Sequence, residues 1–156
     1  MNRVAREKEV REIVTLLNRL PSEKISLLLT ALQNLSEKPE TIPVSVFSTE
    51  LTAFESACVF LVDEKKLKYK DVAKITKSTP AIVGITYRRA KKKYSGSLPL
   101  DSDIIVPFSI FSSHITVFEA LVLHLRERHT ISQIAALLNR AYRTIWTVHR
   151  RAKVKA

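Results

Sequence analysis

The sequence predicts an all-α protein, and three observations lead to this fold class. Glycine is scarce, with two residues in 156, whereas leucine, alanine, lysine and arginine, which favour helices, are abundant. Apolar residues recur at three- and four-residue spacing, as they do on the buried face of an amphipathic helix. One segment occurs twice, and each copy carries the same succession of helical stretches. We therefore expect an N-terminal helical hairpin followed by two small domains of three to four helices each.

The first 38 residues are predicted to form the hairpin. Helical spacing runs over residues 3–20, Leu20-Pro21 interrupts it, and Ser22 is a suitable N-cap for a second helix. The apolar positions of the two helices are Val10, Ile13, Val14, Leu17, Leu20, Ile25, Leu28, Leu29, Leu32 and Leu35. A piece of this size is too small to bury a core alone. It must pack on the first repeat or on a second copy of itself, and the leucine-rich stripes favour a homodimer through residues 1–38.

The duplication defines the rest of the chain. Residues 42–61, IPVSVFSTELTAFESACVFL, align with 106–125, VPFSIFSSHITVFEALVLHL, at an offset of 64. Residues 72–93, VAKITKSTPAIVGITYRRAKKK, align with 134–155, IAALLNRAYRTIWTVHRRAKVK, at an offset of 62. We expect one domain at 42–94, preceded by a linker or extended lead-in at 36–46, and a second at 106–156. An interdomain linker, SGSLPLDSDII at 95–105, is long enough when extended to span the roughly 34 Å between successive major-groove sites.

Each copy ends in a pattern typical of a helix-turn-helix motif. In the second copy we expect helices at 116–128, 132–138 and 142–153, with Asn139 at the corner between the last two, because Asn tolerates left-handed backbone. In the first copy we expect helices at 52–64 and 69–75, and a third that begins at Pro80. A short apolar helix, a sharp corner and a basic amphipathic helix are the elements of a motif whose second helix enters the DNA major groove.

Charge points to a polyanionic partner. The formal net charge is +11, and the excess lies in the repeats: residues 1–41 hold seven basic and six acidic side chains, 42–93 hold eleven and five, and 94–156 hold eight and four. Such an excess fits DNA, RNA or an anionic membrane surface. The sequence lacks an apolar run of membrane-spanning length and a signal-peptide core, and its single cysteine, Cys58, fits a reducing compartment. We expect a cytoplasmic, nucleoid-associated protein that does not bind membranes.

The last helix of each copy carries the candidate DNA-binding residues. In the second copy they lie opposite apolar Ile145 and Val148, and they include arginines that can bond guanine bidentately and residues that can contact a thymine methyl. These candidates are Tyr142, Arg143, Thr144, Trp146, Thr147, Arg150, Arg151 and Lys153. The equivalent face of the first copy is small and apolar, with Pro80, Ala81, Gly84, Ile85 and Arg88. We therefore expect the first copy to anchor phosphates through Lys77, Thr79, Arg88, Arg89, Lys91, Lys92 and Lys93, and the second to be the main base reader.

These features resemble a known family. Phe54-Glu55 and Phe118-Glu119 open the first helix of each copy, a short Ile/Val-Ala helix follows, and the RRAK run closes the last helix. This pattern is similar to region four of sigma factors, which reads the upstream promoter element, and to LuxR-type domains. The resemblance covers 42–93 and 106–155, and it implies major-groove reading by the third helix and contact with RNA polymerase. Because companion sigma-factor segments and a receiver domain are not recognised, we expect a small transcription regulator.

The sequence also bears on functions other than DNA reading. A glycine-rich phosphate loop, a Ser/His/Asp set and metal-ligand spacing of the four histidines are not visible, so we expect neither an enzyme nor a cofactor. The recurring Glu55 and Glu119 are interpreted as first-turn helix charges or polar ties between helices. Two alternatives remain open: a protein-interaction adaptor of the transcription machinery, favoured by the apolar face of the first copy, and a sequence-independent architectural DNA binder, favoured by charge alone.

Overall fold

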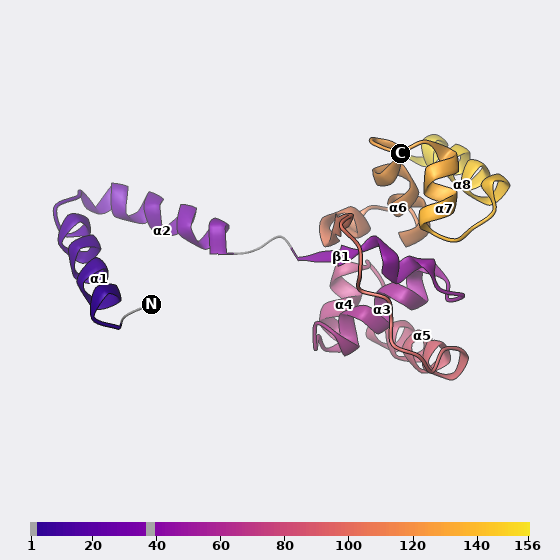
Figure 1. The fold of residues 1–156 in the computed structure, drawn as a ribbon, viewed down its shortest axis with the longest axis horizontal. Helices are drawn as coiled ribbons and strands as arrows, with labels where there is room; N and C mark the ends of the chain where they lie inside the picture. The colour runs from indigo at the N-terminus through magenta and orange to yellow at the C-terminus, as the bar shows by residue number, and fades with distance from the viewer. Residues whose placement is uncertain (1–2, 37–39) are drawn as a thin grey trace. The chain divides into compact units, whose positions relative to one another are not determined.

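The computed structural model describes residues 3–36 and 40–156. The chain is mostly helical, with one short two-stranded sheet in the described part, which confirms the all-α class (Figure 1). It divides into two compact units, Met1–Lys38 and Pro39–Ala156. The predicted end of the N-terminal piece at residue 38 coincides with this division, whereas both copies of the repeat fall within the second unit.

The first unit contains α1 (Arg3–Leu17) and α2 (Ser22–Ser36), separated by the predicted break at Leu20-Pro21. Among the described residues, α1 and α2 make few contacts with each other. Their apolar stripes are consequently uncovered, and the exposed side chains are Val10, Ile13, Val14, Leu16, Leu27, Leu28, Leu29 and Leu32. The predicted apolar position at Leu35 lies outside the side chains that the structure describes.

The second unit repeats one order of elements twice. Each copy begins with a short strand and a 3-10 turn, and three α-helices follow. The first copy comprises β1 (Thr41–Pro43), η1 (Val44–Ser48), α3 (Ala53–Asp63), α4 (Tyr69–Ile75) and α5 (Pro80–Lys93). The second comprises β2 (Ile105–Pro107), η2 (Phe108–Ser112), α6 (Val117–Arg126), α7 (Ile131–Leu137) and α8 (Tyr142–Lys155). The helices agree with the predicted ones. The two strands lie where the sequence predicts a lead-in and the end of a linker. Residues 37–39 of the predicted lead-in lie outside the described part.

Local side-chain chemistry explains where the first helix of each copy begins. Thr52 Oγ1 accepts a hydrogen bond from the N–H of Glu55 at 3.2 Å, and Glu55 Oε2 accepts one from the N–H of Thr52 at 2.9 Å. Thr116 and Glu119 repeat this reciprocal pair at 3.2 and 3.0 Å. Both pairs are capping boxes, which satisfy two backbone donors that the first helical turn would otherwise leave unpaired.

The corner before the third helix is also the same in both copies. Asn139 has a φ of 49°, which confirms the predicted left-handed corner, and Lys77 occupies the equivalent position with a φ of 48°. Beyond each corner the third helix packs across the first two helices of its own copy. Val83 in α5 and Ile145 in α8 are equivalent residues, and both are fully buried. The two copies therefore share one backbone plan and one set of anchoring positions.

The two copies are joined through a local two-fold rotation. β1 and β2 pair antiparallel with Ile42 opposite Val106, which are equivalent residues at the offset of 64. The flanking bonds are equivalent as well: the N–H of Val44 donates to the carbonyl of Ile104 at 2.9 Å, and that of Phe108 donates to the carbonyl of Glu40 at 2.8 Å. A pairing of each residue with its own counterpart in the opposite direction is the pattern of a symmetric dimer.

Side chains complete this junction. The rings of the equivalent residues Phe47 and Phe111 lie 6.2 Å apart, and the buried apolar residues of both copies form one continuous core. Leu98, in the segment predicted as a linker, is 7 % exposed, and the Ser45 hydroxyl donates to the Pro99 carbonyl at 2.8 Å. These contacts correct the picture of two domains at 42–94 and 106–156 on a free linker at 95–105. The sequence shows where the copies begin and end, whereas their association depends on pairing between residues far apart in the chain.

Candidate nucleic-acid interface

Helix α8 presents the predicted residues of the second copy on its outer side. Ile145 is fully buried, and Ala152 continues the inner face two turns later. On the other side, Tyr142 is 55 % exposed and Trp146 is 44 % exposed. The other exposed candidates are Arg143, Thr144, Arg150, Arg151 and Lys153, whereas Thr147 is half-buried and its hydroxyl donates to the Arg143 carbonyl at 2.8 Å. The helix thus separates an anchoring face from a basic and aromatic face.

Trp146 and Arg150 lie together on this outer face. The guanidinium carbon of Arg150 is 5.4 Å from the centre of the indole ring, within the range of a cation–π interaction. The two side chains are one helical turn apart, so the contact restrains the rotamers of both. The surface therefore offers a flat aromatic ring and a positive charge side by side, instead of two independent flexible groups.

The outer face of α5 is different. Ile82 and Ile85 are about half exposed, and Pro80, Ala81 and Arg88 are exposed as well. Gly84, which the sequence places on the same face, is buried, so that prediction is wrong. The Tyr69 ring covers it: Cε2 lies 3.2 Å from where a Cβ on Gly84 would be.

The covering of Gly84 has a counterpart in the second copy. There Trp146 takes the place of Gly84, and Ile131 takes the place of Tyr69 at the start of the preceding helix. We infer that the Tyr69 ring requires a residue without a side chain on the third helix, and that the smaller Ile131 is compatible with Trp146. The alignment shows this exchange only when positions 69 and 131 are compared together with positions 84 and 146. The prediction for Gly84 used its own position alone.

Two of the predicted phosphate anchors in the first copy are held by carboxylates. Lys91 Nζ lies 3.0 Å from Asp63 Oδ2, and Lys93 Nζ lies 2.8 Å from Glu55 Oε1. Lys77, Arg88, Arg89 and Lys92 are exposed, and Thr79 is used as the N-cap of α5, where its hydroxyl accepts from the N–H of Ile82 at 3.3 Å. The ion pairs tie the end of α5 to α3, so Lys91 and Lys93 are less available to a polyanion than their exposure suggests.

The second copy repeats the tie through Lys155, which the sequence analysis did not select. Lys155 Nζ lies 2.7 Å from Glu119 Oε1, as Lys93 does from Glu55 in the first copy. Burial alone would raise the pKa of both glutamates, but the hydrogen bonds from the lysines and from the capping threonines outweigh it and hold each pKa below its ordinary value. The interpretation of both glutamates as polar ties between helices is confirmed. Recurrence of a Glu and a Lys in both copies was the available signal.

Two further groups on the third helices have altered acidity. The Tyr87 hydroxyl donates to Asp63 Oδ1 at 2.7 Å, and this bond, together with burial, raises the pKa of Tyr87 to about 12. His149 occupies the equivalent place in α8, and burial and the nearby positive charges of Lys153 and Arg126 lower its pKa. His149 is therefore neutral at pH 7, and the positive charge of α8 comes from its arginines and lysines.

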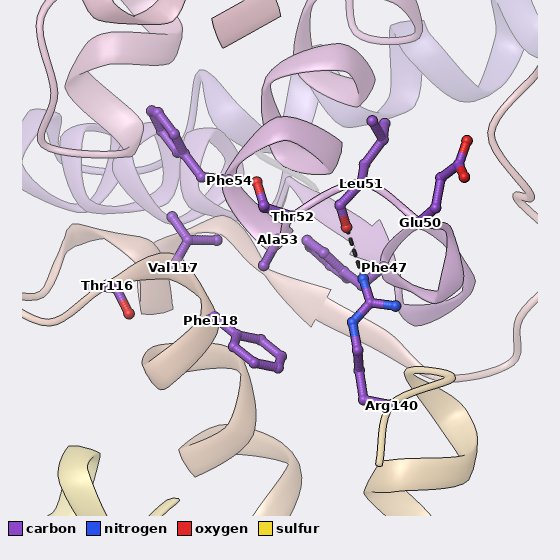
Figure 2. Close-up of a pocket in the computed structure, with 10 residues that line it drawn as sticks. All are labelled: Phe47, Glu50, Leu51, Thr52, Ala53, Phe54, Thr116, Val117, Phe118 and Arg140. Atoms are coloured by element: carbon purple, nitrogen blue, oxygen red, sulfur yellow. Dashed lines mark hydrogen bonds between the residues drawn. The ribbon is translucent and has the colours of Figure 1, made fainter. Parts of the chain in front are cut away.

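The start of each first helix borders a groove of about 390 Å³ within the second unit (Figure 2). Equivalent residues of the two copies line it: Thr52, Ala53 and Phe54 from α3, and Thr116, Val117 and Phe118 from α6. At one side Arg140, from the corner before α8, donates to the carbonyls of Thr49 and Leu51 at 2.8 and 2.7 Å. Arg140 is a basic residue that the sequence analysis missed, and its role is to hold the two copies together.

Other kinds of site are not evident in the described part of the chain. Within residues 3–36 and 40–156, His, Cys, Asp and Glu do not gather in groups of three or more that could hold a metal ion. Cys58 is buried, and burial followed by the charge of Glu55 raises its pKa to about 12, so its thiol is protonated at neutral pH. The helices of the same residues all fall short of the length and apolar character needed to cross a membrane.

Comparison with known proteins gives no match, whether to a family model, to a curated sequence or to a solved structure.

Proposed function

We propose that this chain is a sequence-reading double-stranded DNA-binding protein that regulates transcription, with a helix-turn-helix motif in each copy and α8 as the main base-reading helix. The observation that supports this most is the division of α8 into a buried face at Ile145 and an outer face with Arg143, Trp146 and Arg150. The left-handed corner at Asn139 turns the chain from α7 into this helix, as the motif requires.

The outer face of α8 has chemistry suited to a major groove. Its 14 residues span about 21 Å, enough to cross the groove. Arg143, in the first turn, is placed as the residues that contact base edges are in such helices, and an arginine can bond both acceptors of a guanine. Arg151 and Lys153 follow nearer the C-terminal end, where phosphate contacts would position the helix without reading sequence.

Helix α5 is suited to a supporting role. Arg88, Arg89 and Lys92 are exposed and free of the carboxylate ties that hold Lys91 and Lys93. The half-exposed Ile82 and Ile85 at its N-terminal end cannot hydrogen-bond to base edges, although they can contact thymine methyl groups. These two isoleucines favour a second candidate function, an adaptor that docks α5 on a protein of the transcription machinery such as RNA polymerase.

The test is fluorescence anisotropy of the full chain on a randomised duplex pool at two salt concentrations, with sequencing of the retained fraction. A salt-dependent affinity with an enriched sequence supports the proposal. Arg143→Ala should flatten the sequence preference, whereas the matched control Arg128→Ala, an exposed arginine beyond the end of α6, should leave the preferred sequence unchanged.

The contrary outcomes identify the alternatives. Salt-dependent binding without an enriched sequence would make the protein an architectural binder. Absence of binding at moderate salt would make α5 and α8 protein-docking helices, and the search would turn to polymerase subunits.

We also propose that the first unit is a homodimer interface. Its described apolar residues are exposed on both helices, for example Ile13 at 56 % and Leu27 at 71 %, and burying each such side chain contributes about 1.5–3 kcal/mol. The stripes are bordered by charges of both signs, in near-equal number over residues 1–41, so the surface complements a second copy of itself better than it complements a polyanion. Paired units would join their four helices into a bundle.

Sedimentation equilibrium of the full chain tests this. We expect a dimer that Leu28→Glu with Leu32→Glu converts to a monomer, while Ser26→Glu, an exposed position of the same helix outside the apolar stripe, leaves the mass unchanged. A wild-type monomer at high concentration would refute the interface.

A further inference from the structure

The two third helices are related by the local two-fold rotation that relates the copies. Three equivalent contacts establish this rotation: the strand pairing centred on Ile42 and Val106, the reciprocal backbone bonds on either side of it, and the Phe47–Phe111 ring contact. The same rotation maps α3 onto α6 and α5 onto α8. Residues 40–156 thus have, within one chain, the arrangement that a homodimer obtains from two chains.

We infer that the DNA site of this protein is an inverted pair of half-sites, one for α8 and one for α5, and not a direct repeat. The inference rests on the DNA-binding function proposed above. When two equivalent helices dock in the same way on one duplex, the symmetry of the site follows the symmetry of the protein. A two-fold rotation produces inverted half-sites, whereas a direct repeat requires the copies to be related by a translation along the duplex.

The junction does not leave the copies free to rearrange. A direct repeat would require the antiparallel pairing of β1 and β2 to break, and with it the bonds at Val44 and Phe108. It would also uncover the shared core and remove the Arg140 bonds to the first copy. Because the segment 95–105 is held by Leu98 and Pro99, it does not act as a flexible tether. The half-sites should therefore have a single orientation and a single spacing.

The two arms of the DNA site should differ in how strongly the protein specifies their base sequence. Arg143 and Thr147 of α8 correspond to Ala81 and Ile85 of α5, so base-bonding groups on one helix are replaced by apolar groups on the other. The arm under α8 should be strongly specified. The arm under α5 should be weakly specified and contacted mainly through its phosphates by Arg88 and its neighbours.

The first experiment uses full chains that carry Leu28→Glu and Leu32→Glu, so that two α8 helices of a homodimer cannot occupy both arms of the site. It compares three duplexes of equal length built from the sequence that α8 selects: the half-site with an inverted second copy, the half-site with a direct second copy, and the half-site alone. Spacing is varied in single base-pair steps. The double variant Ala81→Arg with Ile85→Thr, which gives α5 the base-bonding groups of α8, should bind the inverted duplex at least about tenfold more tightly than the other two at one spacing. Wild-type α5, which contacts mainly phosphates, should not distinguish the inverted duplex from the direct one. Hydroxyl-radical footprints should show two protected backbone segments related by a two-fold axis. Equal affinity of the double variant for the inverted and direct duplexes, or protection of one arm only in the wild-type footprint, would overturn the inference.

A second experiment makes the copies alike. The double variant Ala81→Arg with Ile85→Thr places the α8 residues on the exposed face of α5 without touching a buried position. In the DNA selected from the randomised pool, the arm under α5 should then become strongly specified. Its sequence should be the inverted copy of the arm under α8. An unchanged weak arm, or a new arm in direct orientation, would count against the two-fold arrangement on DNA.

Failure of the proposed function is distinguishable from failure of this inference. If the wild-type chain enriches no sequence, the base-reading role of α8 is wrong. If it enriches one sequence but its footprint protects one arm only, α8 reads DNA and only the placement of α5 on the same duplex is wrong.

Discussion

The two copies of the repeat have nearly the same skeleton and different outer faces. Both begin the first helix with a Thr–Glu capping box, both turn at a left-handed corner, and both fasten the third helix to the first through a Glu–Lys pair. They differ where Tyr69 covers Gly84 in the first copy, because Ile131 and Trp146 occupy the equivalent positions in the second. The capping boxes, the left-handed corners and the Glu–Lys pairs are common to both copies, whereas the outer faces of the third helices differ. The residues that hold the helices together are therefore largely separate from those on the outer faces of α5 and α8.

The largest expected effect tests whether the two copies behave as one structure. Ile145→Ala removes a fully buried side chain and should lower the free energy of unfolding by about 2–5 kcal/mol. Because the core is continuous, urea unfolding followed by circular dichroism and by the fluorescence of Trp146 should stay coincident. Val83→Ala, at the equivalent site, should also lower the midpoint detected at Trp146 in the other copy. A Val83→Ala midpoint unchanged at Trp146 would indicate two independent domains.

A smaller effect tests the exchange between Tyr69 and Gly84. Gly84→Trp should lower the free energy of unfolding by about 1–3 kcal/mol, because the indole would occupy the space of the Tyr69 ring. Adding Tyr69→Ile should restore most of this loss, since the pair would then match Ile131 and Trp146. Thermal unfolding of the single and double variants measures the coupling. A double variant no more stable than Gly84→Trp alone would show that the exchange does not explain the difference between the copies.

The Glu–Lys ties should contribute equally in the two copies and should depend on pH. Glu55→Gln and Glu119→Gln should each lower stability by about 1–2 kcal/mol at pH 7, because each weakens a charge-assisted bond and half of a capping box. The pKa of each glutamate is lower in the folded chain than its ordinary value of 4.5. This stabilisation is therefore complete above about pH 4.5 and is lost as pH falls through the folded pKa.

The corresponding measurement is the free energy of unfolding as a function of pH. The difference between wild type and each variant should be constant at neutral pH and should narrow in acid. A difference that persists unchanged in acid would show that packing, not ionisation, accounts for the effect.

The smallest expected effect on stability concerns the left-handed corner before the third helix of each copy. Lys77 and Asn139 both adopt left-handed backbone, but only Asn is well suited to it. Lys77→Gly should raise the free energy of unfolding by roughly 0.5–1 kcal/mol, and Asn139→Gly should change it by less. Urea unfolding of both variants measures the difference. A loss of stability in Lys77→Gly would mean that the lysine side chain makes a contact that outweighs its backbone strain.

Sequence alone determined the features that depend on neighbouring residues. Helical spacing located the helices, the Leu20-Pro21 break divided α1 from α2, and Asn139 marked a corner because of its backbone preference. The duplication was equally readable, since the alignment of the copies does not require coordinates. These features follow from local backbone preferences and from the periodicity of burial, both of which are written along the chain.

Tertiary structure decided the features that depend on residues far apart. The pairing of Ile42 with Val106 turned two apparent tandem domains into one two-fold unit, and the bonds of Arg140 hold its halves together. The same kind of distant contact gives Glu55 its partner Lys93 and buries Gly84 under Tyr69, and the sequence analysis identified neither partner. A sequence states which residues are apolar or charged, but the partner that each one meets is set by the packing of the whole unit.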